Sequence, residues 1–124
     1  MRDKHKILIL DFGSQYTQLI ARRVREIGVF SEVKPSSIPI DKIIEMNPSG
    51  IILSGGPETV TVSSSQKVDK FLLKSNIPIL GICYGMQTIA NELGGSVINS
   101  DIREFGHAKI SNVKQSVLFN DISF

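Results

Sequence analysis

Hydrophobic residues in this chain follow two alternating patterns, which together predict four β-α units. Short stretches such as 7–10, 51–53 and 79–82 are apolar throughout, which is typical of parallel strands that are buried on both faces. Between them, apolar residues recur every three to four positions, as in amphipathic helices. The predicted strands cover residues 6–10, 32–34, 50–53 and 78–82, and the predicted helices cover residues 15–27, 40–46, 64–74 and 85–93. The sequence therefore predicts an α/β fold with a doubly wound, mostly parallel sheet and helices on both faces.

The helical patterns also predict where helices begin and end and which side chains face the core. Gly28 is expected to end the first helix, and Ser63 with Gln66 resembles a capping box before the third. The residues expected to face the core are Tyr16, Leu19, Ile20, Val24 and Ile27 in the first helix, Val68, Phe71 and Leu72 in the third, and Met86, Ile89, Ala90 and Leu93 in the fourth.

The pattern changes after Gly95. Short extended segments are predicted at 96–98, 104–110 and 116–119, and no further helix is predicted. The sequence stops at Phe124 in a mixture of apolar and polar residues. We therefore expect residues 1–124 to be the N-terminal portion of a longer domain.

Composition and charge exclude several classes of protein. A chain of 124 residues with 41% hydrophobic residues can form one core, or part of one. Its formal net charge of +2 is too small to indicate nucleic-acid binding, and no apolar run approaches the roughly 18 residues of a membrane helix. A single cysteine cannot form an intrachain disulfide. We expect a cytoplasmic protein that binds neither nucleic acid nor membranes.

A candidate nucleophile lies where the fourth predicted strand meets the fourth helix. The residues Gly81-Ile82-Cys83-Tyr84-Gly85 follow the pattern G-x-C-x-G, the cysteine form of a nucleophile elbow. Glycines on both sides permit a tight turn, and the helix N-terminus favours a thiolate over a thiol. A lone cysteine is also often just a small buried hydrophobic residue. Cys83 is the candidate nucleophile because it lies at the carboxyl end of a strand, where open α/β sheets bind ligands.

A second loop supports this interpretation. Ser54, Gly55, Gly56 and Pro57 follow the third predicted strand and should lie beside the elbow in a parallel sheet. The backbone N–H groups of Gly56 and Tyr84 are candidates for an oxyanion hole. A Gly-Gly pair can equally be a simple turn.

Together the two loops resemble the motifs of class I glutamine amidotransferases. Within that family the resemblance is closest to the N-terminal glutaminase domains of glutamine-hydrolysing GMP synthases, and it extends over nearly the whole chain. Two further segments carry it: residues 11–26, which begin Asp11-Phe12-Gly13-Ser14-Gln15-Tyr16-Thr17, and residues 103–108, Arg103-Glu104-Phe105-Gly106-His107-Ala108.

The resemblance implies a reaction and a set of roles. The Cys83 thiolate would attack the side-chain carboxamide of glutamine, the amides of Gly56 and Tyr84 would hold the oxyanion, and Gln87 and Gly55 would contact the substrate. Ammonia would leave, and a glutamyl thioester would be hydrolysed. The ammonia would then pass to a synthetase domain that uses ATP and Mg²⁺ to aminate XMP to GMP in a protein that forms a homodimer when complete. Residues 1–124 themselves are expected to hold no cofactor or metal.

The sequence departs from the family at the general base. The family completes its catalytic triad with a neighbouring histidine and glutamate, and no such pair follows Cys83. His5 and His107 are the two histidines of the chain, and neither matches the triad position. We therefore expect the 124-residue chain alone to be inactive. Two alternatives stay open: a naturally short, non-catalytic protein that binds glutamine or a partner through the retained residues, or another cysteine-elbow hydrolase of the same architecture.

Overall fold

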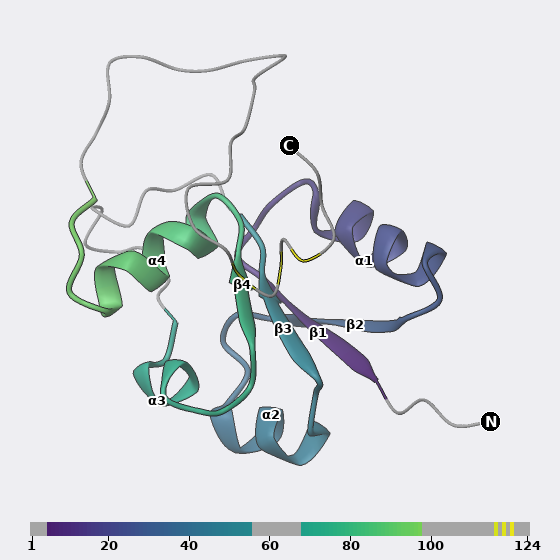
Figure 1. Ribbon diagram of the computed structural model, residues 1–124, viewed down its shortest axis with the longest axis horizontal. Helices are drawn as coiled ribbons and strands as arrows, with labels where there is room; N and C mark the ends of the chain where they lie inside the picture. Colours follow the sequence, from purple (N-terminus) through teal and green to yellow (C-terminus); the bar gives the residue numbers. More distant parts are fainter. Residues whose placement is uncertain (1–4, 56–67, 98–115, 117, 119, 121–124) are drawn as a thin grey trace.

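A computed structural model describes residues 5–55, 68–97, 116, 118 and 120 of the chain and shows a parallel sheet flanked by helices (Figure 1). The described strands form one sheet with the order β2-β1-β3-β4, and all their pairings are parallel. The strands are β1 (Lys6–Asp11), β2 (Phe30–Pro35), β3 (Gly50–Leu53) and β4 (Ile79–Gly81), and the helices are α1 (Thr17–Glu26), α2 (Ile40–Met46), α3 (Lys70–Leu73) and α4 (Tyr84–Glu92).

The strand order brings the candidate loops to one edge of the sheet. From β1 the chain moves outward to β2, then crosses back to β3 and continues to β4 on the other side. The winding direction therefore reverses between β1 and β3, and ligands of such sheets bind beyond the carboxyl ends of the strands at this point. The loops after β1, β3 and β4 all begin at this carboxyl edge of the sheet. The predicted α/β, doubly wound, parallel architecture is confirmed.

The core lies mainly on the face of the sheet that α2, α3 and α4 cover. Leu8 and Leu10 of β1 alternate along the strand and point to this face, together with Ile51 and Leu53 of β3. Ile9, between the two leucines, is also fully buried. The central strand is therefore covered on both faces, as its continuous apolar run predicted. Ile43, Leu72 and Tyr84 extend this cluster from α2, α3 and α4.

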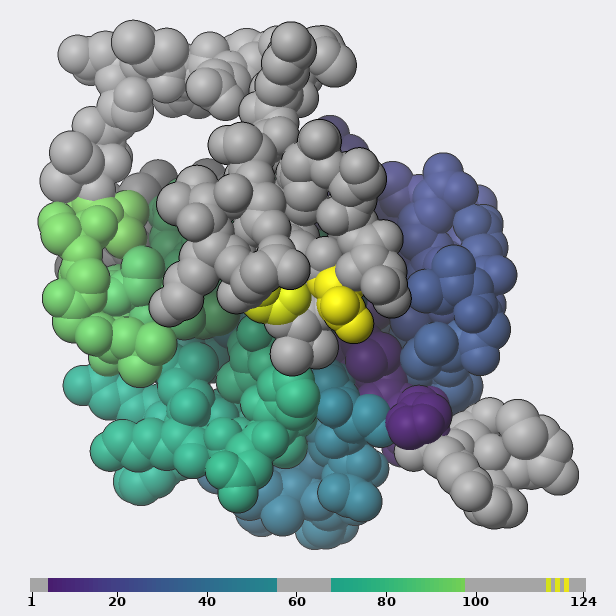
Figure 2. All heavy atoms as spheres, viewed as in Figure 1, coloured from purple at the N-terminus to yellow at the C-terminus, as the bar shows by residue number. Residues whose placement is uncertain are grey.

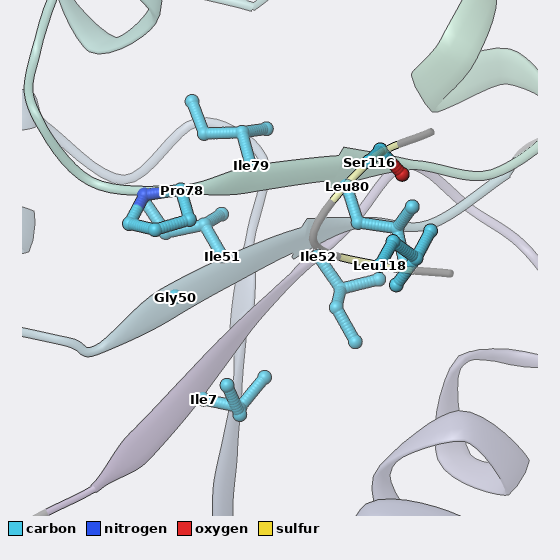
Figure 3. Close-up of a pocket in the computed structure, with 9 residues that line it drawn as sticks. All are labelled: Ile7, Gly50, Ile51, Ile52, Pro78, Ile79, Leu80, Ser116 and Leu118. Atoms are coloured by element: carbon cyan, nitrogen blue, oxygen red, sulfur yellow. The ribbon is translucent and has the colours of Figure 1, made fainter. Parts of the chain in front are cut away.

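Helix α1 lies across the sheet from α2 (Figure 1). Beside it, over β3 and β4, lies an apolar groove of about 460 Å³ lined in part by Ile7, Ile52 and Leu80. Ser116 and Leu118, coloured yellow in Figure 2, also line it, and Leu118 lies beside Leu80 and Ile52 in Figure 3. None of the groove's lining residues comes from the candidate loops after β1, β3 or β4.

The third helix is shorter than predicted. It begins at Lys70, where Asp69 caps it by accepting the N–H of Phe71 at 2.8 Å. Val68 precedes the helix and is buried there, whereas Phe71 is 71% exposed, so its assignment to the core was wrong. The predicted capping box at Ser63 and Gln66 lies outside the described residues.

The buried faces of α1 and α4 were also wrongly assigned in part. Helix α1 buries Thr17 and Ala21, and α4 buries Tyr84, Gly85 and Thr88. Several residues of the predicted apolar stripes are exposed instead: Tyr16, Leu19, Ile27, Met86 and Leu93. Small residues on the packed face bring these helices close to the sheet. The two buried threonine hydroxyls are hydrogen-bonded: that of Thr17 lies 3.0 Å from Oγ of Ser54, and that of Thr88 accepts the N–H of Val68 at 3.2 Å.

Of the extended segments predicted after Gly95, the first is wrong where it can be seen, because Ser96 and Val97 are not in a strand. The segment 104–110 lies outside the described residues, as do residues 117 and 119 of the third segment.

Candidate active site

Cys83 occupies a strained turn between β4 and α4. The strand ends at Gly81 and the helix begins at Tyr84, so two residues make the whole change of direction. Cys83 has φ 54° and ψ −114°, and within the described residues only Asn47, in the left-handed cap of α2, shares a positive φ among non-glycine residues. Such a conformation costs on the order of 1–3 kcal/mol, which the surrounding packing must offset. The predicted elbow geometry is confirmed, and its thiol is exposed.

Close backbone packing explains the glycines of the elbow. A Cβ on Gly85 would lie 2.7 Å from the Cβ of Leu53 and would overlap the Leu53 carbonyl oxygen. A Cβ on Gly81 would lie 2.7 Å from the nitrogen of Met86. Real Cβ atoms do not approach other atoms this closely. A side chain at Gly85 would therefore force the elbow away from β3, and one at Gly81 would force the end of β4 away from the first turn of α4.

Hydrogen bonds hold the turn to the neighbouring strand. The N–H of Ile82 donates to the carbonyl of Leu53 at 3.0 Å, and the N–H of Gly85 donates to the carbonyl of Ile82 at 2.9 Å. The carbonyl of Cys83 accepts the N–H of Gln87 at 3.1 Å, which starts the hydrogen bonding of α4. The thiol is therefore carried by a turn that is fixed on both sides.

The loop after β3 lies against Cys83, as the sequence predicted. Gly55 is buried, and a Cβ on it would lie 2.8 Å from the Cβ of Cys83 and 3.6 Å from its Sγ. Tyr84 is the first residue of α4, directly after the thiol, and its ring packs against Phe12 with the centroids 5.4 Å apart. Gly56 lies outside the described residues, so the oxyanion hole of Gly56 and Tyr84 stays a prediction.

Gln87 lies one helical turn after Cys83. Gln87 is in the first turn of α4, and its backbone N–H is hydrogen-bonded to the carbonyl of Cys83. Gln87 is half-buried. The roles of Gln87 and Gly55 in substrate contact stay predictions.

The histidine that the structure describes, His5, does not lie near Cys83. His5 directly precedes β1 and is exposed, so it lies at the amino end of the sheet, whereas Cys83 follows the carboxyl end of β4. The six residues of β1 alone separate the two edges by roughly 20 Å. His107 lies outside the described residues.

A buried polar network beside the site was not predicted from the sequence. Asp11, Thr17 and Ser54 form hydrogen bonds with one another or with neighbouring backbone groups, and Thr17 and Ser54 are buried. One signal in the sequence could have indicated it. Thr17 lies four residues before Ala21 and therefore on the same side of the helix, and a hydroxyl buried on that side needs hydrogen-bond partners. The pattern of hydrophobic residues alone gave it no role.

No helix in the described part of the chain is long and apolar enough to cross a membrane. The same residues contain no cluster of three or more His, Cys, Asp or Glu side chains that could hold a metal ion.

Comparison with known proteins agrees with this geometry. The family model for glutamine amidotransferase class-I matches residues 8–123. This chain belongs to the class I glutamine amidotransferase family. The match begins in β1 and includes the elbow at Cys83 and the loop at Gly55.

Relatives within the family are GMP synthases. The chain is 60% identical over 119 residues to the glutamine-hydrolysing GMP synthase of Tolumonas auensis, and 55% identical over 117 residues to that of Teredinibacter turnerae. These alignments cover 96% and 94% of this chain but only 23% and 22% of the relatives, so the chain spans less than a quarter of their length.

A solved structure has the same fold. It is described as a GMP synthase subunit from Thermoplasma acidophilum and superimposes with a TM-score of 0.72 at 36% identity. The superposition covers 82% of this chain and 51% of that one. The fold and the homology to GMP synthase glutaminase portions therefore rest on both sequence and structure.

Proposed function

We propose that residues 1–124 form the nucleophile-bearing N-terminal portion of a glutaminase domain, which releases ammonia from glutamine for the synthesis of GMP in the cytoplasm. The observation that carries the proposal is the strained elbow at Cys83, held against the Gly55 loop in a member of the amidotransferase family. A turn that costs free energy and exposes a thiol at the end of a strand is typical of a nucleophile.

The proposed reaction starts at the thiolate of Cys83. Its sulfur forms a bond to the side-chain carboxamide carbon of glutamine, and the carbonyl electron pair moves to the oxygen. The N–H groups of Tyr84 and Gly56 donate to this oxyanion, and Gln87 and Gly55 contact the rest of the substrate. The C–N bond then breaks, and ammonia leaves after receiving a proton. Water adds to the glutamyl thioester, loses a proton, and displaces the thiolate to give glutamate.

Two of these steps require a proton carrier. A positioned base typically contributes 10² to 10⁴-fold, because it protonates the leaving group and later deprotonates the attacking water. The family uses a histidine paired with a glutamate, and His5, the histidine that the structure describes, lies at the opposite edge of the sheet. The proposal is therefore that this chain alone forms a covalent bond with a glutamine analogue but does not sustain turnover.

The ammonia would be used outside this chain. The relatives named GMP synthase are more than four times as long as the matched segment. We assign the amination of XMP, with its ATP and Mg²⁺, to a synthetase domain of the whole protein, and the homodimer to that protein as well. No step of the reaction at Cys83 needs ATP or Mg²⁺.

The experiment uses the purified 124-residue chain. Cys83 is labelled with the chloromethyl ketone analogue of glutamine, from which the thiolate displaces chloride without a general base, and the adduct is detected by intact mass. Ammonia release from glutamine is followed in parallel. We expect one adduct per chain, slowed by added glutamine and absent in Cys83→Ala, without steady ammonia release.

Two results would contradict the proposal in different ways. Labelling that glutamine does not slow would show that the chain has no glutamine site. Steady ammonia release that Cys83→Ala abolishes would show that the chain contains its own base, and His107→Asn would be the next variant to measure. Binding of glutamine to the chain without any Cys83 adduct would instead favour the non-catalytic binding protein.

A further inference from the structure

Two hydroxyl groups are buried beside the candidate active site. Ser54 is 0% exposed and Thr17 is 2% exposed. The Ser54 hydroxyl donates to the carbonyl of Leu10 at 2.9 Å and accepts the N–H of Phe12 at 3.4 Å. The Thr17 hydroxyl has one proton and lies 3.0 Å from Oγ of Ser54 and 3.1 Å from Oδ1 of Asp11, so it donates to one or the other.

These contacts tie three segments together at the carboxyl edge of the sheet. Leu10 and Phe12 belong to the end of β1, Thr17 begins α1, and Ser54 follows β3. The backbone N–H of Ser54 also donates to the carbonyl of Leu10 at 3.0 Å, so both the main chain and the side chain of Ser54 are fixed to β1. The network is anchored further by the N–H of Gly13, which donates to Oδ1 of Asp11 at 2.7 Å.

The residue after Ser54 is the one that touches the nucleophile. The backbone of Gly55 approaches Cys83 so closely that an added Cβ would lie 2.8 Å from the Cβ of Cys83. Gly55 has no side chain of its own to hold it, so its position depends on its neighbours in the chain. The hydroxyl of Ser54 fixes the peptide that enters Gly55, and Gly55 leads into Gly56, the proposed oxyanion donor.

We propose that Ser54 and Thr17 are positioning residues, which set the Gly55 loop at the distance from Cys83 that attack on glutamine requires. The inference rests on the proposed function and adds two residues to it. A buried hydroxyl costs free energy unless its hydrogen bonds are made. If Ser54 and Thr17 only filled space, apolar residues of similar size would serve equally well at both positions. Misplacing reacting groups by about 1 Å can slow a reaction by about 10²-fold.

The test compares two reagents on the purified 124-residue chain. Both the chloromethyl ketone analogue of glutamine and iodoacetamide alkylate the thiolate by displacing a halide, but only the first must occupy the glutamine site. The ratio of the two rate constants at Cys83 therefore measures positioning and cancels changes in thiol reactivity. The variants are Ser54→Ala, Thr17→Val and the conservative Thr17→Ser, each measured at a temperature where circular dichroism shows it to be folded.

Ser31→Ala is the matched control. Ser31 is 3% exposed, and its hydroxyl donates to the carbonyl of Ala21 in α1 at 3.0 Å, but it lies in β2 at the side of the sheet away from β4. The Ser31→Ala variant therefore loses a buried hydroxyl hydrogen bond, as the test variants do, but at a position away from the site. We expect the ratio to fall by about tenfold or more in Ser54→Ala and Thr17→Val, and to change less than about twofold in Ser31→Ala and Thr17→Ser.

Each other outcome overturns the inference. A ratio in Ser54→Ala and Thr17→Val that matches Ser31→Ala would mean that the network only stabilises the fold. The same conclusion follows if both variants fail to fold at any temperature while Ser31→Ala folds. A failure of the proposed function is recognised separately, because glutamine would then not slow the labelling of the unmutated chain.

Discussion

Gly85 in the first turn of α4 lies directly against the main chain of Leu53 at the end of β3: a Cβ on Gly85 would come within 2.8 Å of the carbonyl carbon of Leu53. The elbow that carries Cys83 and the loop that carries Gly55 are therefore in contact through backbone atoms. Because backbone atoms cannot move aside as a flexible side chain can, this contact fixes the spacing between the two loops.

Gly85→Ala should destabilise the chain by at least about 2 kcal/mol, because the added methyl group must push the elbow and β3 apart. Urea unfolding followed by circular dichroism measures the change. Gly50→Ala is the control, since its Cβ would meet the flexible Cδ1 of Ile7 at 3.2 Å and the carbonyl oxygen of Pro78 at an ordinary contact distance of 3.7 Å. It should cost less than about 1 kcal/mol. Equal losses in the two variants would contradict the close contact at Gly85.

Cys83→Gly should be more stable than Cys83→Ala by about 1 kcal/mol, the reverse of the usual order of glycine and alanine. Glycine adopts the observed φ of 54° without a steric cost, whereas alanine retains the strain of the native residue. The thiol is exposed, so its loss is nearly equal in both variants. Urea unfolding of the pair decides the point, and a more stable alanine variant would argue against backbone strain at the elbow.

Neighbouring residues of α3 should respond very differently to truncation. Leu72 is 1% exposed within the core, so Leu72→Ala should cost about 2–5 kcal/mol through lost burial and the cavity that remains. Phe71 is 71% exposed, and Phe71→Ala should change the stability by less than about 0.5 kcal/mol. Thermal unfolding of both variants tests whether α3 presents the face seen in the structure.

Gln87→Ala should lower the rate of Cys83 labelling by the chloromethyl ketone analogue of glutamine by about tenfold, with the iodoacetamide rate unchanged, because the substrate would lose a hydrogen-bonding contact. Asn91→Ala is the control one turn farther along the same side of α4, and it should leave both rates unchanged. If the two variants behave alike, Gln87 does not contact the substrate.

Local sequence signals predicted the strands well and the helix faces poorly. The range 40–46 of α2 and the range 50–53 of β3 agree with the structure at both ends, and the limits of β1 and β4 differ by one residue at most at each end. The faces of α1 and α4 were misjudged because periodicity weights large apolar residues. Here Ala21 and Gly85 set the packed face, since their small size allows close approach to the sheet.

The sequence by itself determined the parallel sheet, the elbow at Cys83 and its neighbour at Gly55. Continuous apolar runs and glycines at fixed spacing are local features, and parallel strands bring their carboxyl ends to one edge whatever the details of packing. Only the tertiary structure decided that the hydroxyls of Thr17 and Ser54, which are 37 residues apart, lie within hydrogen-bond distance of each other beside the site. Such a contact depends on the exact phase of α1 and on the registers that β1 and β3 adopt, and packing of the whole core sets both.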